Sequence, residues 1–169
     1  MAILNEASVC LAYFMILGVL SHVLGEAVRR ETIRFDRFPY APYRWENGGQ
    51  FYRKLRIETW KGMLPDKSRF VRTMVRKNLG DDRSGGHIKR LIEETCVAEQ
   101  VHWLLLFAGP LLQLFSNSAF VRVAGFLYSA SNIPFILIQR YNRPRLVALY
   151  QKIRMREALW NESADLIQQ

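Results

Sequence analysis

Residues 119–138 form an apolar run that ends abruptly in a basic heptapeptide, and this junction limits what the chain can fold into. The heptapeptide, residues 139–145, reads QRYNRPR and contains Arg140, Arg143 and Arg145. About 20 apolar residues are enough for a transmembrane helix, and arginines at its end must reach water or lipid headgroups. The junction is therefore either a basic membrane anchor or an anion-binding site held at the bilayer surface.

Two more apolar runs lie earlier in the chain, at residues 7–25 and 101–115. The first has no basic residue before it and is followed by Arg29 and Arg30, the reverse of the charge order of a signal peptide. We therefore interpret it as a retained span. A helix that begins near Ile88 should carry the second run into the bilayer, with a kink at Pro110. The sequence predicts an all-α integral membrane protein with about three transmembrane helices plus cytoplasmic amphipathic helices.

The distribution of charge predicts the topology. Residues 26–100 and 139–169 are rich in arginine and lysine, and positive charge marks the cytoplasmic side of a membrane protein. We therefore expect a multi-pass protein of the inner cell membrane with its N-terminus outside and both basic regions in the cytoplasm. At 169 residues, the chain should form one membrane-embedded domain.

The net charge of +9 and the pI near 9.9 indicate an anionic partner. Nucleic acid and an acidic membrane surface both fit such a charge. Half of the residues are hydrophobic and occur in clusters, and no nucleic-acid-binding module is recognisable. We therefore expect membrane lipids, and no nucleic acid, as partners. Cys10 and Cys96 are too few for a disulfide framework and are expected to be buried thiols.

The region between the first two runs should hold short helices and an irregular segment. Prolines, glycines and aromatic residues at 35–50 indicate an irregular stretch at the membrane interface, whereas residues 51–63 and 68–79 have helical patterns. The second of these helices would be basic and amphipathic, which suits a helix in the membrane surface or one packed against another protein element. Trp60 and Lys61 are interpreted either as part of an interfacial face or as substrate contacts.

One helix face collects polar residues near the point where the chain enters the bilayer. At about 100° per residue, Glu94, Thr95, Ala98, Glu99 and His102 share this face. Glu99 is three residues before His102 and could orient the imidazole as a general base, with Glu94 supporting it or binding the acceptor. A solvated helix end is the alternative interpretation. A metal site is another, but the spacing matches no strong ligand signature, so we predict none.

The basic heptapeptide is the candidate substrate-binding element. Arg140, Arg143 and Arg145 offer planar donors that suit phosphate or carboxylate, and Tyr141 and Asn142 lie between them. Two prolines shape the predicted backbone here. Pro134, with Asn132, should interrupt the last span, and Pro144 should begin a separate C-terminal helix over residues 144–160. In this interpretation the arginines lie on a loop beside the positive N-terminus of that helix.

Two stretches resemble the family of glycosyl-4,4′-diaponeurosporenoate acyltransferases. The residues of the polar helix follow the pattern E-T-x-x-A-E-x-x-H-W, from Glu94 to Trp103. The second stretch combines Leu127-Tyr128, Asn132-x-Pro134 and residues 139–146 and is similar to the closing motif of the family. The resemblance implies a bacterial membrane enzyme that esterifies a sugar hydroxyl of a glycosylated carotenoid with a fatty acyl chain, the last step of staphyloxanthin synthesis.

The sequence therefore predicts a membrane acyltransferase with a lipid-soluble acceptor and with acyl-CoA or acyl carrier protein as the acyl donor. No bound cofactor is expected, and the oligomeric state is open. No cysteine or serine has a convincing nucleophile context, although Ser129 and Ser131 are weak exceptions, so direct transfer is favoured. Two other classes fit the same residues: a non-enzymatic membrane scaffold or accessory subunit, and a metal-dependent membrane hydrolase.

Overall fold

The computed structural model describes residues 2–64 and 84–167, and their regular secondary structure is entirely helical. The basic amphipathic helix expected at residues 68–79 lies outside these ranges. The chain divides into two compact units. The first unit comprises Met1–Ile33 and Cys96–Gln139, and the second comprises Arg34–Thr95 and Arg140–Gln169.

Three long helices, α1, α4 and α5, account for most of the chain. The elements are α1 (Ala2–Ala27), η1 (Arg30–Thr32), η2 (Arg44–Gly49), α2 (Gln50–Lys54), α3 (Ile57–Trp60), η3 (Lys61–Met63), α4 (Gly85–Ala108), η5 (Gly109–Leu114) and α5 (Ala119–Ile167). Within the described residues, three helical segments are long and apolar enough to cross a membrane: Asn5–Ala27, Gly85–Leu114 and Ala119–Ser163. The predicted all-α class with three candidate spans is confirmed.

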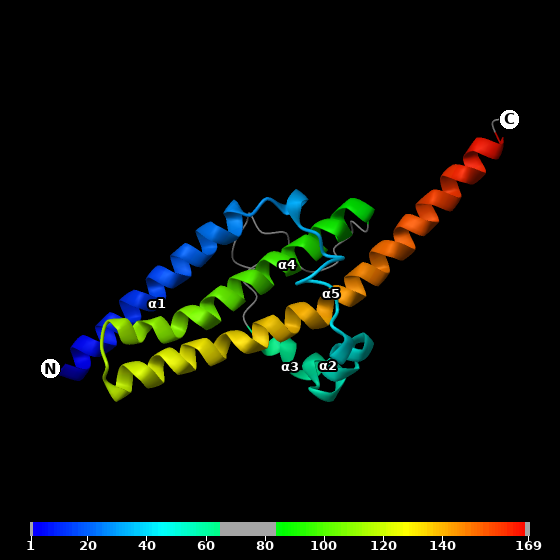
Figure 1. Ribbon diagram of the computed structural model, residues 1–169. Helices are drawn as coiled ribbons and strands as arrows, with labels where there is room; N and C mark the ends of the chain where they lie inside the picture. Colours follow the sequence, from blue (N-terminus) through cyan, green and yellow to red (C-terminus); the bar gives the residue numbers. More distant parts are fainter. Residues whose placement is uncertain (1, 65–83, 168–169) are drawn as a thin grey trace. The chain divides into compact units, whose positions relative to one another are not determined.

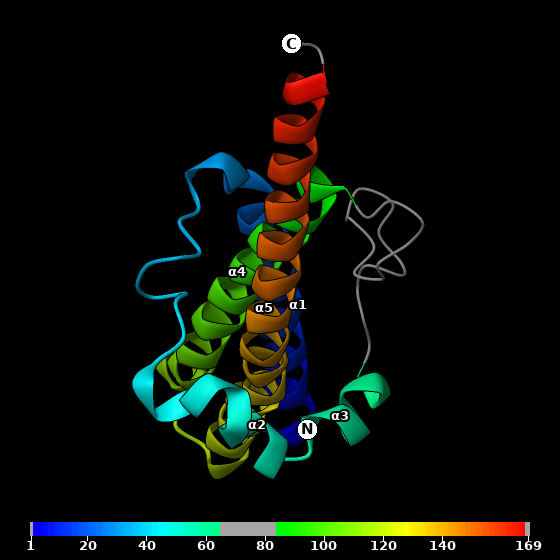
Figure 2. The ribbon, with the colours of Figure 1, turned by 90° about the vertical axis from the view of Figure 1, so that its right-hand side faces the viewer.

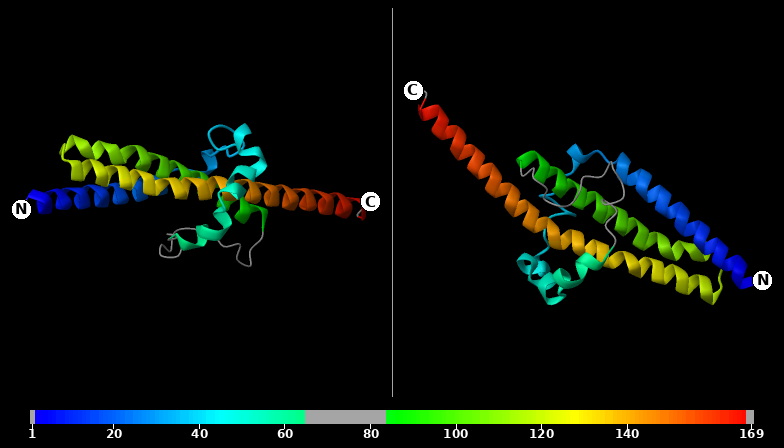
Figure 3. Two further views of the ribbon diagram at one scale, coloured as in Figure 1. Left: turned by 90° about the horizontal axis from the view of Figure 1, so that it is seen from below. Right: turned by 180° about the vertical axis from the view of Figure 1, so that it is seen from behind.

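The first unit packs α1 beside the later half of α4 and the first half of α5 (Figures 1 and 3). Two small apolar clusters join these helices, Cys10–Leu112–Val121 and Leu17–Leu105–Ala108. The outer face of α1 is also apolar, because Leu11, Met15, Ile16, Val19, Leu20, Val23 and Leu24 are all exposed. An exposed apolar surface of this extent is abnormal for a protein in water and is typical of a helix that faces lipid.

The α-helix α4 ends just before Pro110. The α-helix stops at Ala108, and the chain continues as the 3₁₀-helix η5 with the proline in its first turn. Proline suits this position because its missing N–H would have no partner in a first turn. The hydroxyl of Tyr13 donates to the carbonyl oxygen of Ala108 at 2.6 Å, which satisfies an acceptor where the α-helix ends. The kink itself stays a prediction, and the structure shows a change from α-helix to 3₁₀-helix at this point.

Glycines allow η5 and α5 to approach closely in the first unit. A Cβ atom on Gly109 would lie 2.7 Å from the carbonyl oxygen of Gly125 and would overlap the hydroxyl of Ser129. Only a residue without a side chain fits there. The Ser129 hydroxyl is buried and has no hydrogen-bond partner among the residues that the structure describes, so close packing characterises this contact.

Helix α5 corrects two predictions about the chain after residue 130. Asn132 and Pro134 do not interrupt the helix, and Pro144 does not start a new one over residues 144–160, because α5 is continuous from Ala119 to Ile167. Each proline removes only one N–H donor from the helix. Tyr141 and Arg143, which precede Pro144 in the chain, are buried, and Leu146 and later residues pack against the core of the second unit. This packing holds the helix through the proline.

The second unit has its own core between the first turns of α4 and the last part of α5. Ile88, Leu91 and Ile92 are buried against Ile153, and partly buried side chains surround them: Phe35, Leu146, Val147, Leu149 and Tyr150. Figure 2 shows the segment after α1 (cyan) leading into α2 and α3 (teal). Residues 51–63, expected as one helix, form parts of three short helices, because Arg56 adopts the left-handed conformation (φ 49°, ψ 39°) between α2 and α3.

Candidate functional site

His102 is held by two residues of α5 in the first unit. Its Nδ1 atom lies 2.9 Å from Oδ1 of Asn132. Its ring stacks on Phe135, with the centroids 4.6 Å apart and the planes at 10°. The imidazole is half-buried, so a hydrogen bond and a stacked ring fix its plane while part of it remains accessible.

The hydrogen bonds of Asn132 define the tautomer of His102. The Asn132 side-chain nitrogen donates to the carbonyl oxygen of Tyr128 at 2.8 Å. The amide oxygen therefore faces the imidazole and needs a donor, which Nδ1–H supplies. In the neutral ring, Nε2 then carries the lone pair. An imidazole with one nitrogen fixed as a donor presents the other as a base, the principle of catalytic histidines oriented by an amide or a carboxylate.

Glu99 lies one turn before His102, as predicted, and is buried. Its Oε1 atom accepts a hydrogen bond from the indole nitrogen of Trp103 at 3.3 Å. The proposed pairing of Glu99 with His102 stays a prediction, whereas the bond to Nδ1 belongs to Asn132. From sequence, Asn132 was expected only to interrupt a span. An amide within an apolar run was nevertheless a usable signal, because polar side chains at membrane depth tend to be functional.

Arg140 is buried in the second unit, where it bonds to a carboxylate and to backbone carbonyl oxygens. Its Nε lies 2.6 Å from Oε1 of Glu46, and its terminal nitrogens donate to the carbonyl oxygens of Pro39 (3.1 Å) and Ala41 (3.2 Å). Its guanidinium lies 4.1 Å from the ring centroid of Tyr43. One side chain thus joins α5 to the irregular segment of residues 39–46.

Arg143 makes a parallel set of contacts one turn later. It donates to the hydroxyl of Thr95 at 3.0 Å, to the carbonyl oxygen of Thr95 at 3.1 Å, and to the carbonyl oxygen of Tyr40 at 2.9 Å. Thr95 comes from the predicted polar face of α4. The predicted arginine loop is therefore wrong, because these arginines project from a helix. Substrate binding by Arg140 and Arg143 stays a prediction, and the contacts that the structure shows fasten the backbone of residues 39–41.

Arg145, Tyr141 and Lys61 meet at Glu58 in the same unit. The Tyr141 hydroxyl donates to the Glu58 carboxylate, and Nη2 of Arg145 lies 2.9 Å from Oε1 of Glu58. Arg145 lies 3.6 Å and Lys61 4.9 Å from the centroid of the Tyr141 ring. The hydrogen bond from Tyr141, followed by the nearby positive charges of Arg145 and Lys61, lowers the pKa of Glu58. We call these four residues the Tyr141 cluster; its two cations were predicted substrate contacts.

The other residues predicted for the site, Glu94, Trp60 and Asn142, either bond to residues nearby in the sequence or are half-buried. Glu94 pairs with Arg90 at 3.3 Å on the outer part of α4. The indole nitrogen of Trp60 donates to the carbonyl oxygen of Leu55 at 3.0 Å, and Asn142 is half-buried on α5. In the described part of the chain, no group of three or more histidine, cysteine, aspartate or glutamate side chains could hold a metal ion.

Glu46 is the main residue that the sequence reasoning missed in the second unit. It is only 1% exposed and pairs with Arg140. Burial and the Glu46 carboxylate together raise the pKa of the neighbouring Tyr52 hydroxyl. A signal was present: Asp36 and Glu46 are the only acidic residues in the basic stretch 34–56. A lone carboxylate among arginines, followed by Asn-Gly-Gly, is a candidate for a buried pair at a turn.

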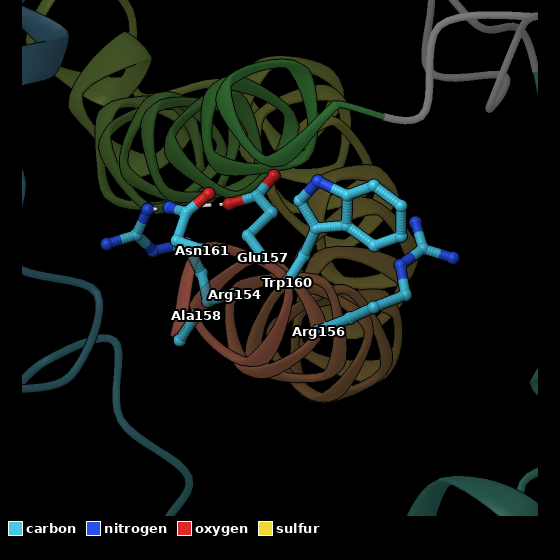
Figure 4. Close-up of a pocket in the computed structure, with 6 residues that line it drawn as sticks. All are labelled: Arg154, Arg156, Glu157, Ala158, Trp160 and Asn161. Carbon is cyan, nitrogen blue, oxygen red and sulfur yellow. Dashed lines mark hydrogen bonds and ion pairs between the residues drawn. The ribbon is translucent and has the colours of Figure 1, made fainter. Parts of the chain in front are cut away.

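A hollow on the late part of α5 offers no comparable chemistry. Figure 4 shows its lining residues, Arg154, Arg156, Glu157, Ala158, Trp160 and Asn161, which all project from this one helix. The Arg154–Glu157 pair, at 3.4 Å, is exposed. Exposed ion pairs on one helix are common surface features. Two candidate sites therefore remain, one in each unit: the His102–Asn132 pair in the first unit and the Tyr141 cluster in the second.

Fold and site together define a small helical protein with three candidate membrane spans and an amide-oriented histidine on one of them. The family model described as glycosyl-4,4′-diaponeurosporenoate acyltransferase matches residues 36–152, which include every candidate residue discussed above. This match covers more than half of the chain. The chain belongs to this acyltransferase family, and it is an acyltransferase enzyme.

Relatives of the same description come from Staphylococcus aureus. The protein of strain bovine RF122 / ET3-1 is 27% identical over 165 residues, and that of strain N315 is 26% identical over 160 residues. Each alignment covers 90% of this chain and 93% of the relative. Both are named glycosyl-4,4′-diaponeurosporenoate acyltransferase. No solved structure matches the chain.

Proposed function

We propose that this acyltransferase is an integral membrane protein that transfers a fatty acyl group to a hydroxyl of a lipid-embedded acceptor. The acceptor is a sugar hydroxyl of a glycosylated carotenoid or a similar glycolipid. The observation that carries the mechanism is the Nδ1–Asn132 bond, which makes Nε2 the nitrogen that carries the lone pair in the neutral ring of His102. The names of the relatives support the class of acceptor.

The proposed step is direct transfer from a thioester donor, acyl-CoA or acyl carrier protein. Nε2 of His102 takes the proton of the acceptor hydroxyl while the hydroxyl oxygen forms a bond to the acyl carbon. The carbon–sulfur bond breaks, and the departing thiolate receives the proton from the imidazolium. A positioned base of this kind contributes roughly 10²- to 10⁴-fold to the rate. Glu99 supports His102 from the preceding turn, and Glu94 supports the site or binds the acceptor.

The Tyr141 cluster is the proposed contact for the phosphates of the acyl donor. The Arg145 side chain is 47% exposed and is paired with an exposed carboxylate, so a phosphate could replace that partner at small cost. Lys61 lies over the same ring. Trp60 and Asn142 flank these residues in the sequence and complete the proposed surface. Arg140 and Arg143 contribute by fixing residues 39–46 through buried hydrogen bonds, with donor binding as a further proposed role.

The proposed location is the inner cell membrane, with the N-terminus outside and the basic regions in the cytoplasm. Three apolar helical segments of sufficient length support multiple spans. The excess of arginine and lysine after the first and last spans supports the orientation. Membrane lipids, the lipid-soluble acceptor and the acyl donor are then the partners. The thioester donor is water-soluble at its phosphate end, which fits chemistry at the cytoplasmic leaflet.

Mass spectrometry of total lipids tests the proposed function. A host that supplies glycosylated carotenoid and acyl donors is transformed with the wild-type gene or with an empty vector. We expect a glycolipid or carotenoid glycoside to gain the mass of one acyl chain only with the wild-type gene. If the protein accumulates in the membrane and no lipid gains an acyl chain, the proposed acceptor class is wrong.

A further inference from the structure

Four aromatic rings of the second unit form a continuous exposed patch. Phe38, Tyr43, Trp45 and Phe51 touch in series, with centroid distances of 6.4, 5.9 and 5.0 Å. Phe38 is 82% exposed, Trp45 56% and Phe51 37%. We call these residues the aromatic patch. Water contact with three large aromatic side chains is unfavourable, since burying one is worth about 1.5–3 kcal/mol, so the patch needs a partner.

Two buried residues, Arg140 and Tyr52, contact the rings of the aromatic patch. The guanidinium of Arg140 lies 4.1 Å from the centroid of the Tyr43 ring, and the same guanidinium is held by the buried carboxylate of Glu46. Tyr52, which is fully buried, packs its ring 6.4 Å from that of Trp45. Buried neighbours therefore hold the exposed rings in place.

Exposed basic residues lie next to the aromatic patch residues in the sequence. Arg37, Arg44, Arg53 and Lys54 are all exposed beside the patch residues in the sequence. The whole segment 34–64 contains seven basic and three acidic residues, and one of the acids, Glu46, is buried. The exposed surface of the segment is thus strongly positive, which suits a negatively charged partner.

We propose that the aromatic patch lies in the headgroup region of an anionic bilayer. Tryptophan and tyrosine are favoured at this depth because their rings are apolar while their polar atoms stay hydrated. Each basic residue near an anionic surface adds about 1 kcal/mol of attraction. Phe38 follows α1, a candidate span, by only eleven residues, so the chain tethers the patch close to the bilayer. The inference rests on the proposed membrane placement and goes beyond acyl transfer: it makes residues 38–51 a second, in-plane membrane contact.

Tryptophan fluorescence in vesicles tests the proposal. Single-tryptophan proteins retain Trp45, Trp103 or Trp160, with phenylalanine at the other tryptophan positions, and helical circular dichroism verifies their folding. Trp103 reports on the proposed span, and Trp160, 74% exposed on α5 (Figure 4), serves as a water-exposed reference. The vesicles contain phosphatidylglycerol and lipids brominated near the carbonyl end of the acyl chain. Iodide in the buffer reports access from water.

We expect the brominated lipids to quench Trp45 and Trp103, and iodide to quench Trp45 much less than Trp160. Quenching of Trp103 by lipid, with Trp45 quenched only by iodide, overturns the aromatic patch as a membrane contact but leaves the spans. Absence of lipid quenching at Trp103 overturns the membrane placement as well. A second variant, Arg44→Glu in the Trp45 protein, should shift the Trp45 emission to longer wavelength in anionic vesicles. If Trp45 emits at the same wavelength with arginine and with glutamate at position 44, the role of anionic lipid is contradicted.

Discussion

Replacing Arg140 by methionine should open the segment of residues 39–46. The substitution keeps an apolar stem but leaves the Glu46 carboxylate, 2% exposed, without the guanidinium 2.6 Å away. The carbonyl oxygens of Pro39 and Ala41 lose donors too. Removing one partner of a buried ion pair costs about 3–5 kcal/mol. Since each 1.4 kcal/mol is tenfold, the open population of the segment should rise about 100- to 4,000-fold.

Limited proteolysis measures this opening in detergent-solubilised protein. Trypsin cleaves after Arg37, just before the segment, and after Arg44, within it, and both arginines are exposed. The cleavage rate follows the open population when opening is fast relative to cleavage. The matched control is Arg145→Met on the same helix. Arg145 pairs with Glu58 at an exposed position, so this change should alter stability by no more than about 1 kcal/mol.

A double variant separates the ion pair from general loss of packing. Arg140→Met combined with Glu46→Leu removes both charges and should recover most of the stability lost in the single variant, because an apolar pair of similar size replaces the ions. The reasoning is refuted if Arg140→Met leaves the cleavage rate at the wild-type value. It is also refuted if the effects of the two single changes simply add in the double variant, since coupled partners are non-additive.

Three further predictions concern other contacts. Gly109→Ala should destabilise the first unit by about 1–3 kcal/mol, because the new methyl group would lie 2.7 Å from the Gly125 carbonyl oxygen. Gly18→Ala, which has open space around it, should leave the stability unchanged. Thermal unfolding of both variants tests this prediction. Tyr141→Phe should raise the pKa of Glu58 by removing its main hydrogen bond. The ionised carboxylate adds stability that is lost as pH falls through its folded-state pKa, and this contribution should become smaller in the variant. A carboxyl NMR titration that shows an unchanged Glu58 pKa contradicts this. Arg145→Gln should raise the KM for acyl-CoA roughly tenfold, and Arg156→Gln should leave it unchanged; equal KM values for both variants remove Arg145 from the donor site.

The helices and the family could be predicted from the sequence because both depend on local patterns. Apolar runs of membrane length defined the three candidate spans, and the residues from Glu94 to Trp103 and from 139 to 146 carried the family resemblance. The polar face of α4 was also real: Thr95 is buried against Arg143, and His102 reaches Asn132. Periodicity predicts which residues share a face, and these contacts lie on that face.

The partners in contacts between distant segments could not be predicted, because no local pattern says which distant residue a side chain such as Glu46 will meet. The pairing of Glu46 with Arg140 joins residues 94 positions apart, and Tyr141 meets Glu58 across 83 positions. The error at Pro144 had a related cause. Proline statistics favour a helix start, but the buried side chains on both sides of this proline stabilise a continuous helix. Tertiary packing therefore overrode the local preference, and it turned a predicted loop of arginines into one face of α5.

The central claim, that His102 is the base of an acyl transfer, is tested most directly by the rate of transfer in membranes with matched amounts of protein. His102→Ala should lower the rate by roughly 10²- to 10⁴-fold. Asn132→Leu should lower it less, because the ring remains but its tautomer is no longer fixed. His22→Ala removes an exposed histidine from α1 and should leave the rate unchanged. Full turnover by a folded, membrane-inserted His102→Ala protein would contradict the claim.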